Sequence, residues 1–254
     1  MSQIQPRAHP FLFRGNDTGC LLLHGLPGSP YEVREMGEFL AEKGFSVCGP
    51  RLFGHGTHHD DLKRAKWWDW VNSAMDGYYQ LSDICSRIIL VGLSMGGAIS
   101  LLLGSRLAVD GVFVMAVPFT IPVKHASRIR PFLPIISQFW RYYNSGSSDW
   151  TDREAERTHS AYEKRPLRIY GELYDLLGVM REELPNLSAP LRLIYSEDDG
   201  SIPTSDAQEI LNTVTSHDKE VFLIDGSGHN IPRDAKRDEV FHLASRFVDK
   251  VVST

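Results

Sequence analysis

Three polar residues that are far apart in the chain, Ser94, Asp199 and His229, each follow a run of apolar residues. Ser94 lies in a G-x-S-x-G motif at residues 92–96, after the apolar run 88–91 and before apolar residues that favour a helix. This order predicts a buried strand, a sharp turn that exposes the serine hydroxyl, and a helix whose first N–H groups face the space beside it. Negative charge that develops there during acyl transfer would be stabilised.

A serine hydroxyl is a poor nucleophile at neutral pH, so it needs a base within hydrogen-bond reach and an acid that orients this base. Asp199 follows the run that ends at Tyr195, and His229 follows the run that ends at Ile224. Because the carboxyl ends of parallel strands form the ligand crevice of an open α/β sheet, we expect the three side chains to meet there. The alternative, a glycine-rich turn with an idle serine, leaves the other two residues unexplained.

Strands and helices that would position these residues alternate along the chain. Apolar runs typical of buried strands lie at residues 19–25, 45–48, 88–91, 111–117, 191–195 and 220–224, and residues 10–14 are typical of an edge strand. Segments with helical spacing separate most of them, which indicates a mostly parallel sheet with helices on both faces. Ser29 is predicted to be the N-cap of the first helix, with Pro30 at its first position.

The alternation stops at Pro118, and no buried strand pattern is visible from there to about Pro185. We predict a helical cap at residues 118–186, inserted between two parts of one α/β core at residues 1–117 and 187–254. The first part of this insertion is rich in aromatic residues that would line an apolar pocket: Phe132, Phe139, Trp140, Tyr142, Tyr143 and Trp150. The helical stripe from Ile169 to Leu184 is explained equally well as core packing of a connecting helix.

The composition excludes some classes of function. The chain has 254 residues, a net charge of −5 and no cluster of Lys or Arg, so it does not have the basic surface of a nucleic-acid-binding protein. No apolar run approaches the length of a membrane span, and the first residues lack the apolar core of a signal peptide. Cys20, Cys48 and Cys85 lack pairing spacing, which predicts buried free thiols, a reducing compartment and hence the cytoplasm.

The chain resembles the α/β-hydrolases, and more narrowly the bacterial monoacylglycerol lipases and small thermostable carboxylesterases. The motifs that carry this resemblance extend over nearly the whole chain except the early cap: LHGLPGSP at 23–30, PRLFGHGTH at 50–58, WDWV at 68–71, GLSMGG at 92–97, AYEK at 161–164 and SEDD at 196–199. The resemblance implies the α/β-hydrolase fold and a serine hydrolase that cleaves carboxylic esters through an acyl-enzyme, without a cofactor. Monoacylglycerols or medium-chain acyl esters are the implied substrates, with short-chain esters as the alternative.

The resemblance also implies residue roles. Ser94 is the nucleophile, and the backbone N–H groups of Leu26 and Met95 form the oxyanion hole. In the family the acid lies four residues before a proline, which favours Asp199, four residues before Pro203, over its neighbour Asp198. A serine at the nucleophile position argues against dehalogenase or epoxide hydrolase chemistry.

Two places leave questions open. Some monoacylglycerol lipases of this group use a cap carboxylate just before the AYEK motif, where this chain has His159 and Ser160, so the contacts with the alcohol end of the substrate are not assigned. A group of histidines and acids could indicate a metal site: His55, His58, His59, Asp60 and Asp61. Their spacing matches no zinc pattern, and the resemblance implies a structural loop, so we expect no metal.

The expected partner is therefore a small, lipid-like ester, with no nucleic acid and no membrane-spanning segment, and the sequence does not fix the oligomeric state. A ligand receptor without catalytic activity, built on the same fold, is the second class of function. The presence of all three candidate catalytic residues favours the enzyme.

Overall fold

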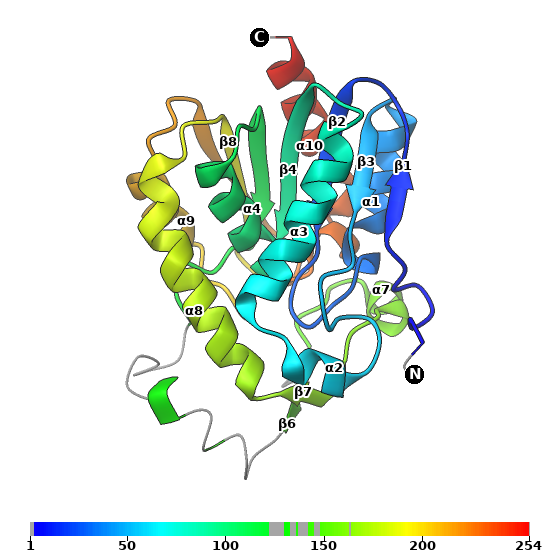
Figure 1. Ribbon diagram of the computed structural model, residues 1–254, viewed down its shortest axis with the longest axis vertical. Coiled ribbons are helices and arrows are strands. Elements are labelled where there is room, and N and C mark those ends of the chain that lie inside the picture. The colour runs from blue at the N-terminus through cyan, green and yellow to red at the C-terminus, as the bar shows by residue number, and fades with distance from the viewer. Residues whose placement is uncertain are drawn as a thin grey trace.

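A seven-stranded sheet lies at the centre of the computed structural model, which describes residues 3–121, 130–132, 136, 142–144, 148–162 and 164–253 (Figure 1). The strand order is β1-β3-β2-β4-β5-β8-β9. Only β1 runs antiparallel, against β3, and every other neighbouring pair is parallel. The strands are β1 (Phe11–Phe13), β2 (Thr18–Leu23), β3 (Ser46–Gly49), β4 (Arg87–Leu93), β5 (Gly111–Met115), β8 (Leu191–Ser196) and β9 (Lys219–Ile224).

Helices cover both faces of this sheet, which confirms the predicted α/β architecture with a mostly parallel sheet (Figure 1). On one face α3 (Trp67–Ser82), α4 (Met95–Arg106) and α8 (Arg168–Glu183) pack against one another. On the other face lie α1 (Tyr31–Glu42) and α10 (Arg237–Val252). The remaining described helices are α2 (His59–Arg64), α7 (Arg153–Thr158) and α9 (Ser205–Thr213), with 3-10 turns η1 (Arg130–Phe132), η2 (Leu184–Asn186) and η3 (Ile231–Arg233).

The central strands are apolar throughout because each face of the sheet is covered. In β4, Leu90 packs into the core on the α3 and α4 side, whereas Ile89 and Val91 pack into the core on the α1 and α10 side. Leu21 and Leu22 of β2 divide in the same way. A strand buried on both faces therefore appears in the sequence as a continuous apolar run rather than as an alternation.

The sheet topology predicts a ligand site at the carboxyl ends of β2 and β4. The chain passes from β2 outward to β3, returns to β4 on the other side of β2, and then continues in the opposite direction to β5. Such a reversal is where ligands bind in open α/β sheets, because the loops after the two central strands diverge. The turn that holds Ser94 follows β4, and the HGLPG loop follows β2.

Three local features differ from the sequence prediction. A second sheet pairs β6 (Tyr142–Asn144) with β7 (Lys164–Pro166) in an antiparallel ladder, although no strand was expected in this region. Its strands are short and polar, so backbone pairing rather than an apolar face defines them. The short helix α2 was also not predicted. The N-cap of α1 is Pro30, so the assignment to Ser29 was wrong; the Ser29 hydroxyl donates to the carbonyl of Ser160 at 3.3 Å.

The helical cap predicted between β5 and β8, at residues 118–186, stays a prediction. Helix α8 packs on α4, and its apolar stripe is buried in the core, which supports the interpretation of this helix as core packing: Ile169, Leu176, Leu177 and Met180. Phe132 is exposed. Phe139, Trp140 and the side chain of Tyr143, part of the predicted pocket lining, lie outside the described residues.

All three cysteines are free and buried, as predicted. None of the helices in the described part of the chain combines the length and the apolar character that crossing a bilayer requires.

Candidate active site

The serine turn has the strained geometry that its motif predicts. Ser94 has φ 53° and ψ −115°, a left-handed conformation that is costly for a residue with a side chain and is typical of functional sites. The backbone fixes it from both sides: the Ser94 N–H donates to the carbonyl of Met115 at 2.8 Å, and the Ser94 carbonyl accepts from Ala98 at 2.9 Å. The serine therefore stands between the end of β4 and the first turn of α4.

Two glycines of the motif allow the backbones around Ser94 to approach closely. A Cβ on Gly96 would lie 2.2 Å from the carbonyl oxygen of Leu23, at the end of β2. A Cβ on Gly92 would lie 2.4 Å from the carbonyl oxygen of Gly96. Both distances are shorter than any side chain tolerates, so this tight strand–turn–helix unit requires glycine at both positions.

Asp199 and His229 meet as the chain order predicts. The Oδ2 atom of Asp199 lies 2.8 Å from Nδ1 of His229, and the Asp199 side chain is buried. The other carboxylate oxygen, Oδ1, accepts from the N–H groups of Ser201 at 2.7 Å and Ile202 at 2.9 Å. These backbone bonds fix the carboxylate, so that Oδ2 remains directed at the imidazole. Within the described part of the chain, Nε2 of His229 has no hydrogen-bond partner.

Asp198 has a different partner. Its Oδ2 atom accepts from the N–H of Gly226 at 2.6 Å, and its own N–H donates to the hydroxyl of Ser196 at 3.2 Å. Asp198 thus connects the loop after β8 to the loop after β9. Of the two aspartates, only Asp199 contacts the imidazole of His229 in the described structure.

The electrostatic surroundings of His229 favour its charged form. Burial disfavours the imidazolium, but the hydrogen bond and charge of Asp199, together with the carboxylates of Asp149 and Glu32, outweigh this effect. The net result is a pKa of His229 above the ordinary value of 6.5. An imidazolium formed by proton transfer from a serine would be stabilised by the same groups.

Glu32 connects the loop after β2 to the loop that carries His229. Its Oε2 accepts from the N–H of Gly25 at 2.8 Å, and its Oε1 accepts from the side-chain amide of Asn230 at 3.0 Å. Gly25 in turn adjoins the serine turn, since a Cβ on Gly25 would lie 3.5 Å from Cβ of Ser94. Glu32 therefore links the loop of His229 to the loop after β2, and Gly25 of that second loop adjoins the turn of Ser94.

Burial raises the pKa of Glu32, although the Gly25 and Asn230 hydrogen bonds oppose the shift. The role of Glu32 was not predicted from the sequence. The available signal was its helical register, because Glu32 shares the buried face of α1 with Met36, four residues later.

The residues expected to form the oxyanion hole follow the same two central strands, β2 and β4. Leu26 follows Gly25 directly, and Met95 is the first residue of α4. The first N–H groups of a helix have no partner within the helix and carry its positive dipole end, so the N–H of Met95 is suited to bind an anion. Their assignment as oxyanion donors stays a proposal.

His24 fixes the loop after β2 rather than acting as a base. Its Nε2 accepts from the N–H of Leu52 at 3.2 Å, and its Nδ1 lies 2.9 Å from the carbonyl of Gly25, to which it donates. Burial lowers the pKa of His24 to about 4. Because both ring nitrogens are engaged, His24 holds the backbone that precedes Leu26.

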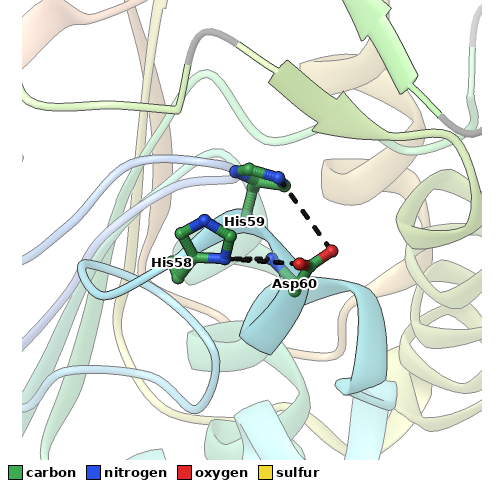
Figure 2. Close-up of side chains that lie close together, drawn as sticks. All are labelled: His58, His59 and Asp60. Carbon is green, nitrogen blue, oxygen red and sulfur yellow. Dashed lines mark hydrogen bonds and ion pairs between the residues drawn. The ribbon is translucent and has the colours of Figure 1, made fainter. Parts of the chain in front are cut away.

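Part of the histidine-rich loop does converge. Figure 2 shows His58, His59 and Asp60 side by side, and among the described residues this is the one group whose candidate ligand atoms all lie within 4.8 Å of one another. These atoms also have protein partners: Nδ1 of His58 accepts from the N–H of Asp60 at 3.3 Å, and Asp60 accepts from the hydroxyl of Tyr142 at 2.7 Å. The polar contacts are those of a helix start, and the absence of a metal stays a prediction.

The chain is similar to several known proteins. The sequence family described as serine aminopeptidase, S33 matches residues 16–236. A thermostable monoacylglycerol lipase of Bacillus sp. (strain H-257) is 30% identical over 96% of this chain and 95% of that protein. A carboxylesterase of Bacillus subtilis (strain 168) is 31% identical over 99% of both chains.

Solved structures share the fold. One described with LipS and LipT, two metagenome-derived lipolytic enzymes, has a TM-score of 0.91 and 25% identity and covers 98% of this chain and 100% of that chain. The monoacylglycerol lipase of Paleococcus ferrophilus has a TM-score of 0.79 with 15% identity over 96% of this chain and 98% of that chain. This second likeness shows the fold alone.

Proposed function

Because this chain belongs to the serine aminopeptidase S33 family, and because full-length relatives of about 30% identity are ester hydrolases, we propose that it is a serine hydrolase that cleaves carboxylic esters. One observation carries the proposal: Asp199 lies 2.8 Å from His229, and Glu32 links Asn230, next to His229, to Gly25, which adjoins the strained turn of Ser94. The nucleophile, the base and the acid are assigned to Ser94, His229 and Asp199.

The reaction proceeds in two acyl transfers. The Ser94 hydroxyl attacks the ester carbonyl while Nε2 of His229 takes its proton, and the N–H groups of Leu26 and Met95 stabilise the oxyanion. The C–O bond to the alcohol breaks, and the proton from His229 leaves with the alcohol. Water then attacks the acyl-serine with His229 as base, and the acid is released as Ser94 regains its proton. Asp199 keeps Nδ1 protonated, so that Nε2 can accept.

The substrate class is narrowed by the named relatives. A monoacylglycerol lipase and a carboxylesterase both match nearly the whole chain at similar identity, so we propose monoacylglycerols or medium-chain acyl esters, with short-chain esters as the alternative. The substrate is a small, lipid-like ester. We place the protein in the cytoplasm, because buried free thiols suit a reducing compartment.

A substrate panel tests this proposal. Purified protein is assayed with 1-monolauroylglycerol, dilauroylglycerol, p-nitrophenyl acetate, p-nitrophenyl laurate and an aminoacyl p-nitroanilide, with the Ser94→Ala variant as the control. We expect a higher kcat/KM for 1-monolauroylglycerol and p-nitrophenyl laurate than for p-nitrophenyl acetate, and no turnover by Ser94→Ala. A higher kcat/KM for the anilide than for the esters would indicate a peptidase instead of an esterase. Equal turnover by the wild type and Ser94→Ala would contradict the assignment of Ser94 as the nucleophile.

A further inference from the structure

Two aspartates connect the catalytic loops to a short segment of the predicted cap, residues 148–152, which we call the stem segment. One aspartate belongs to the stem segment and the other to the core. Asp149, from the stem segment, has one oxygen that accepts two backbone N–H groups of the core. Its Oδ2 accepts from the N–H of His229 at 2.9 Å and from the N–H of Gly200 at 3.1 Å. The first donor is the proposed base itself, and the second is the residue directly after the proposed acid, Asp199.

Asp234 forms the reverse connection. Its carboxylate is fully buried and accepts the N–H groups of Thr151 at 3.1 Å and Asp152 at 2.6 Å, both in the stem segment. It also accepts the N–H of Gly228, the residue before His229, at 2.6 Å. The core carboxylate thus holds the stem backbone, while the stem carboxylate holds the backbone of the two catalytic loops.

Close packing accompanies these hydrogen bonds. A Cβ on Gly228 would lie 2.4 Å from the carbonyl oxygen of Asp149, and a Cβ on Gly200 would lie 3.5 Å from the Cβ of Asp149. The stem segment therefore lies directly against both loops. The loop before His229 contains two glycines, Gly226 and Gly228, so its backbone has wide conformational freedom, and external hydrogen bonds are what restrict it.

We propose that Asp149 is a positioning residue for the proposed catalytic pair: it fixes the backbones of His229 and Gly200 relative to each other and so holds the imidazole against Asp199. This inference rests on the proposed function, since it assigns a role within the same site. The cap then contributes to the catalytic machinery through its stem, in addition to any contact with substrate.

The charge of Asp149 has a second effect, because it is one of three carboxylates that face His229. Asp199 approaches from the loop after β8, Glu32 from α1, and Asp149 from the stem segment. All three favour the imidazolium over the neutral imidazole. Removal of the Asp149 charge should therefore lower the pKa of His229 even where the backbone geometry is preserved.

The effect of Asp149 on backbone position can be separated from the effect of its charge on His229. Both N–H groups bind the same oxygen, so Asp149→Asn can keep both hydrogen bonds through its amide oxygen while losing the charge. Asp149→Ala loses both the acceptor and the charge. Glu154→Gln is the matched control, because it removes one charge from α7, next to the stem segment, and its side chain is in solvent.

The experiment measures kcat and KM for p-nitrophenyl butyrate against pH for the wild type and the three variants. For Asp149→Ala we expect kcat to fall about 10- to 100-fold with KM within about 3-fold, because a small displacement of a catalytic group costs rate rather than binding. For Asp149→Asn we expect a kcat within about 3-fold of the wild type on the alkaline plateau, and an acid limb that moves to lower pH. Glu154→Gln should match the wild type in both respects.

Hydrogen–deuterium exchange of peptides covering residues 196–202 and 225–230 gives a readout that does not depend on turnover. Exchange should accelerate in Asp149→Ala and stay at the wild-type rate in Asp149→Asn. Wild-type exchange rates in Asp149→Ala, or a kcat for this variant within 2-fold of the wild type, would overturn the inference. If the variants show this exchange pattern but the wild type hydrolyses no ester, the proposed function is overturned instead.

Discussion

Replacement of Asp199 by Asn should distinguish the proposed acid from its neighbour. Oδ2 of Asp199 lies 2.8 Å from Nδ1 of His229, and its Oδ1 accepts the N–H groups of Ser201 and Ile202. An Asn side chain has the same shape but only one acceptor oxygen. If that oxygen keeps the two backbone donors, the amide NH₂ faces Nδ1, which must then accept, and the ring proton moves to Nε2.

The expected loss of kcat in Asp199→Asn follows from this change of tautomer. With a proton on Nε2, His229 cannot take the proton of Ser94, and the charge that would stabilise the imidazolium is absent. The same change in a Ser-His-Asp triad lowers kcat by about 10⁴-fold, and at 1.36 kcal/mol per factor of ten this is about 5 kcal/mol of transition-state stabilisation. Asp198→Asn should change kcat by less than about 3-fold, because its amide oxygen can still accept the N–H of Gly226.

The assay is kcat for p-nitrophenyl butyrate, normalised to the fraction of folded protein measured by thermal unfolding of each variant. Both variants should unfold within a few degrees of the wild type, since the backbone acceptors are kept. The reasoning is refuted if Asp198→Asn abolishes turnover while Asp199→Asn retains it, or if Asp199→Asn keeps more than about a tenth of the wild-type kcat.

Three further predictions concern pH, Glu32 and metals. The value of kcat/KM should rise with pH as His229 loses its proton, with a midpoint above 6.5 because its pKa is raised in the folded protein, and a pH–rate profile with its acid limb below 6 would contradict this sign. Glu32→Ala should lower the free energy of unfolding by about 1–3 kcal/mol for each buried donor left without an acceptor, at Gly25 and Asn230, whereas Glu32→Gln should lose less; equal stability of the wild type and Glu32→Ala in urea unfolding would argue against the connection. Treatment with EDTA should leave kcat unchanged, because no proposed step uses a metal, and a loss of activity that zinc restores would point to a role for the group at His58.

The sequence predicted the parts of the site that local patterns determine. Ser94 could be assigned because its strand, turn and helix are consecutive, and the close approach at Gly96 shows why the motif needs its glycines. Asp199 and His229 could be assigned because each follows a buried strand, and parallel strands bring their carboxyl ends to one edge. The choice of Asp199 over Asp198 needed the family pattern, and the contact with Nδ1 of His229 agrees with it.

The partners of residues that bind backbone N–H groups of distant loops could not be predicted, although the helical register of Glu32 indicates its burial. Glu32, Asp149 and Asp234 are ordinary acidic residues in the sequence, and their roles arise only when loops from different strands meet. Sequence spacing does not predict such a contact, because every residue except proline carries a backbone N–H and the donor's residue type therefore gives no signal. The strands β6 and β7 were missed for a related reason: each is three residues long and is defined by pairing with the other.

The central claim is that Ser94 carries the acyl group, and covalent labelling tests it most directly. The protein is treated with a fluorophosphonate, and the adduct is located by intact mass and peptide mapping. We predict one adduct per chain, on Ser94, with no adduct in Ser94→Ala and labelling at least about 100-fold slower in His229→Ala. An adduct on another residue, or an unlabelled wild type that still hydrolyses esters, would contradict the account.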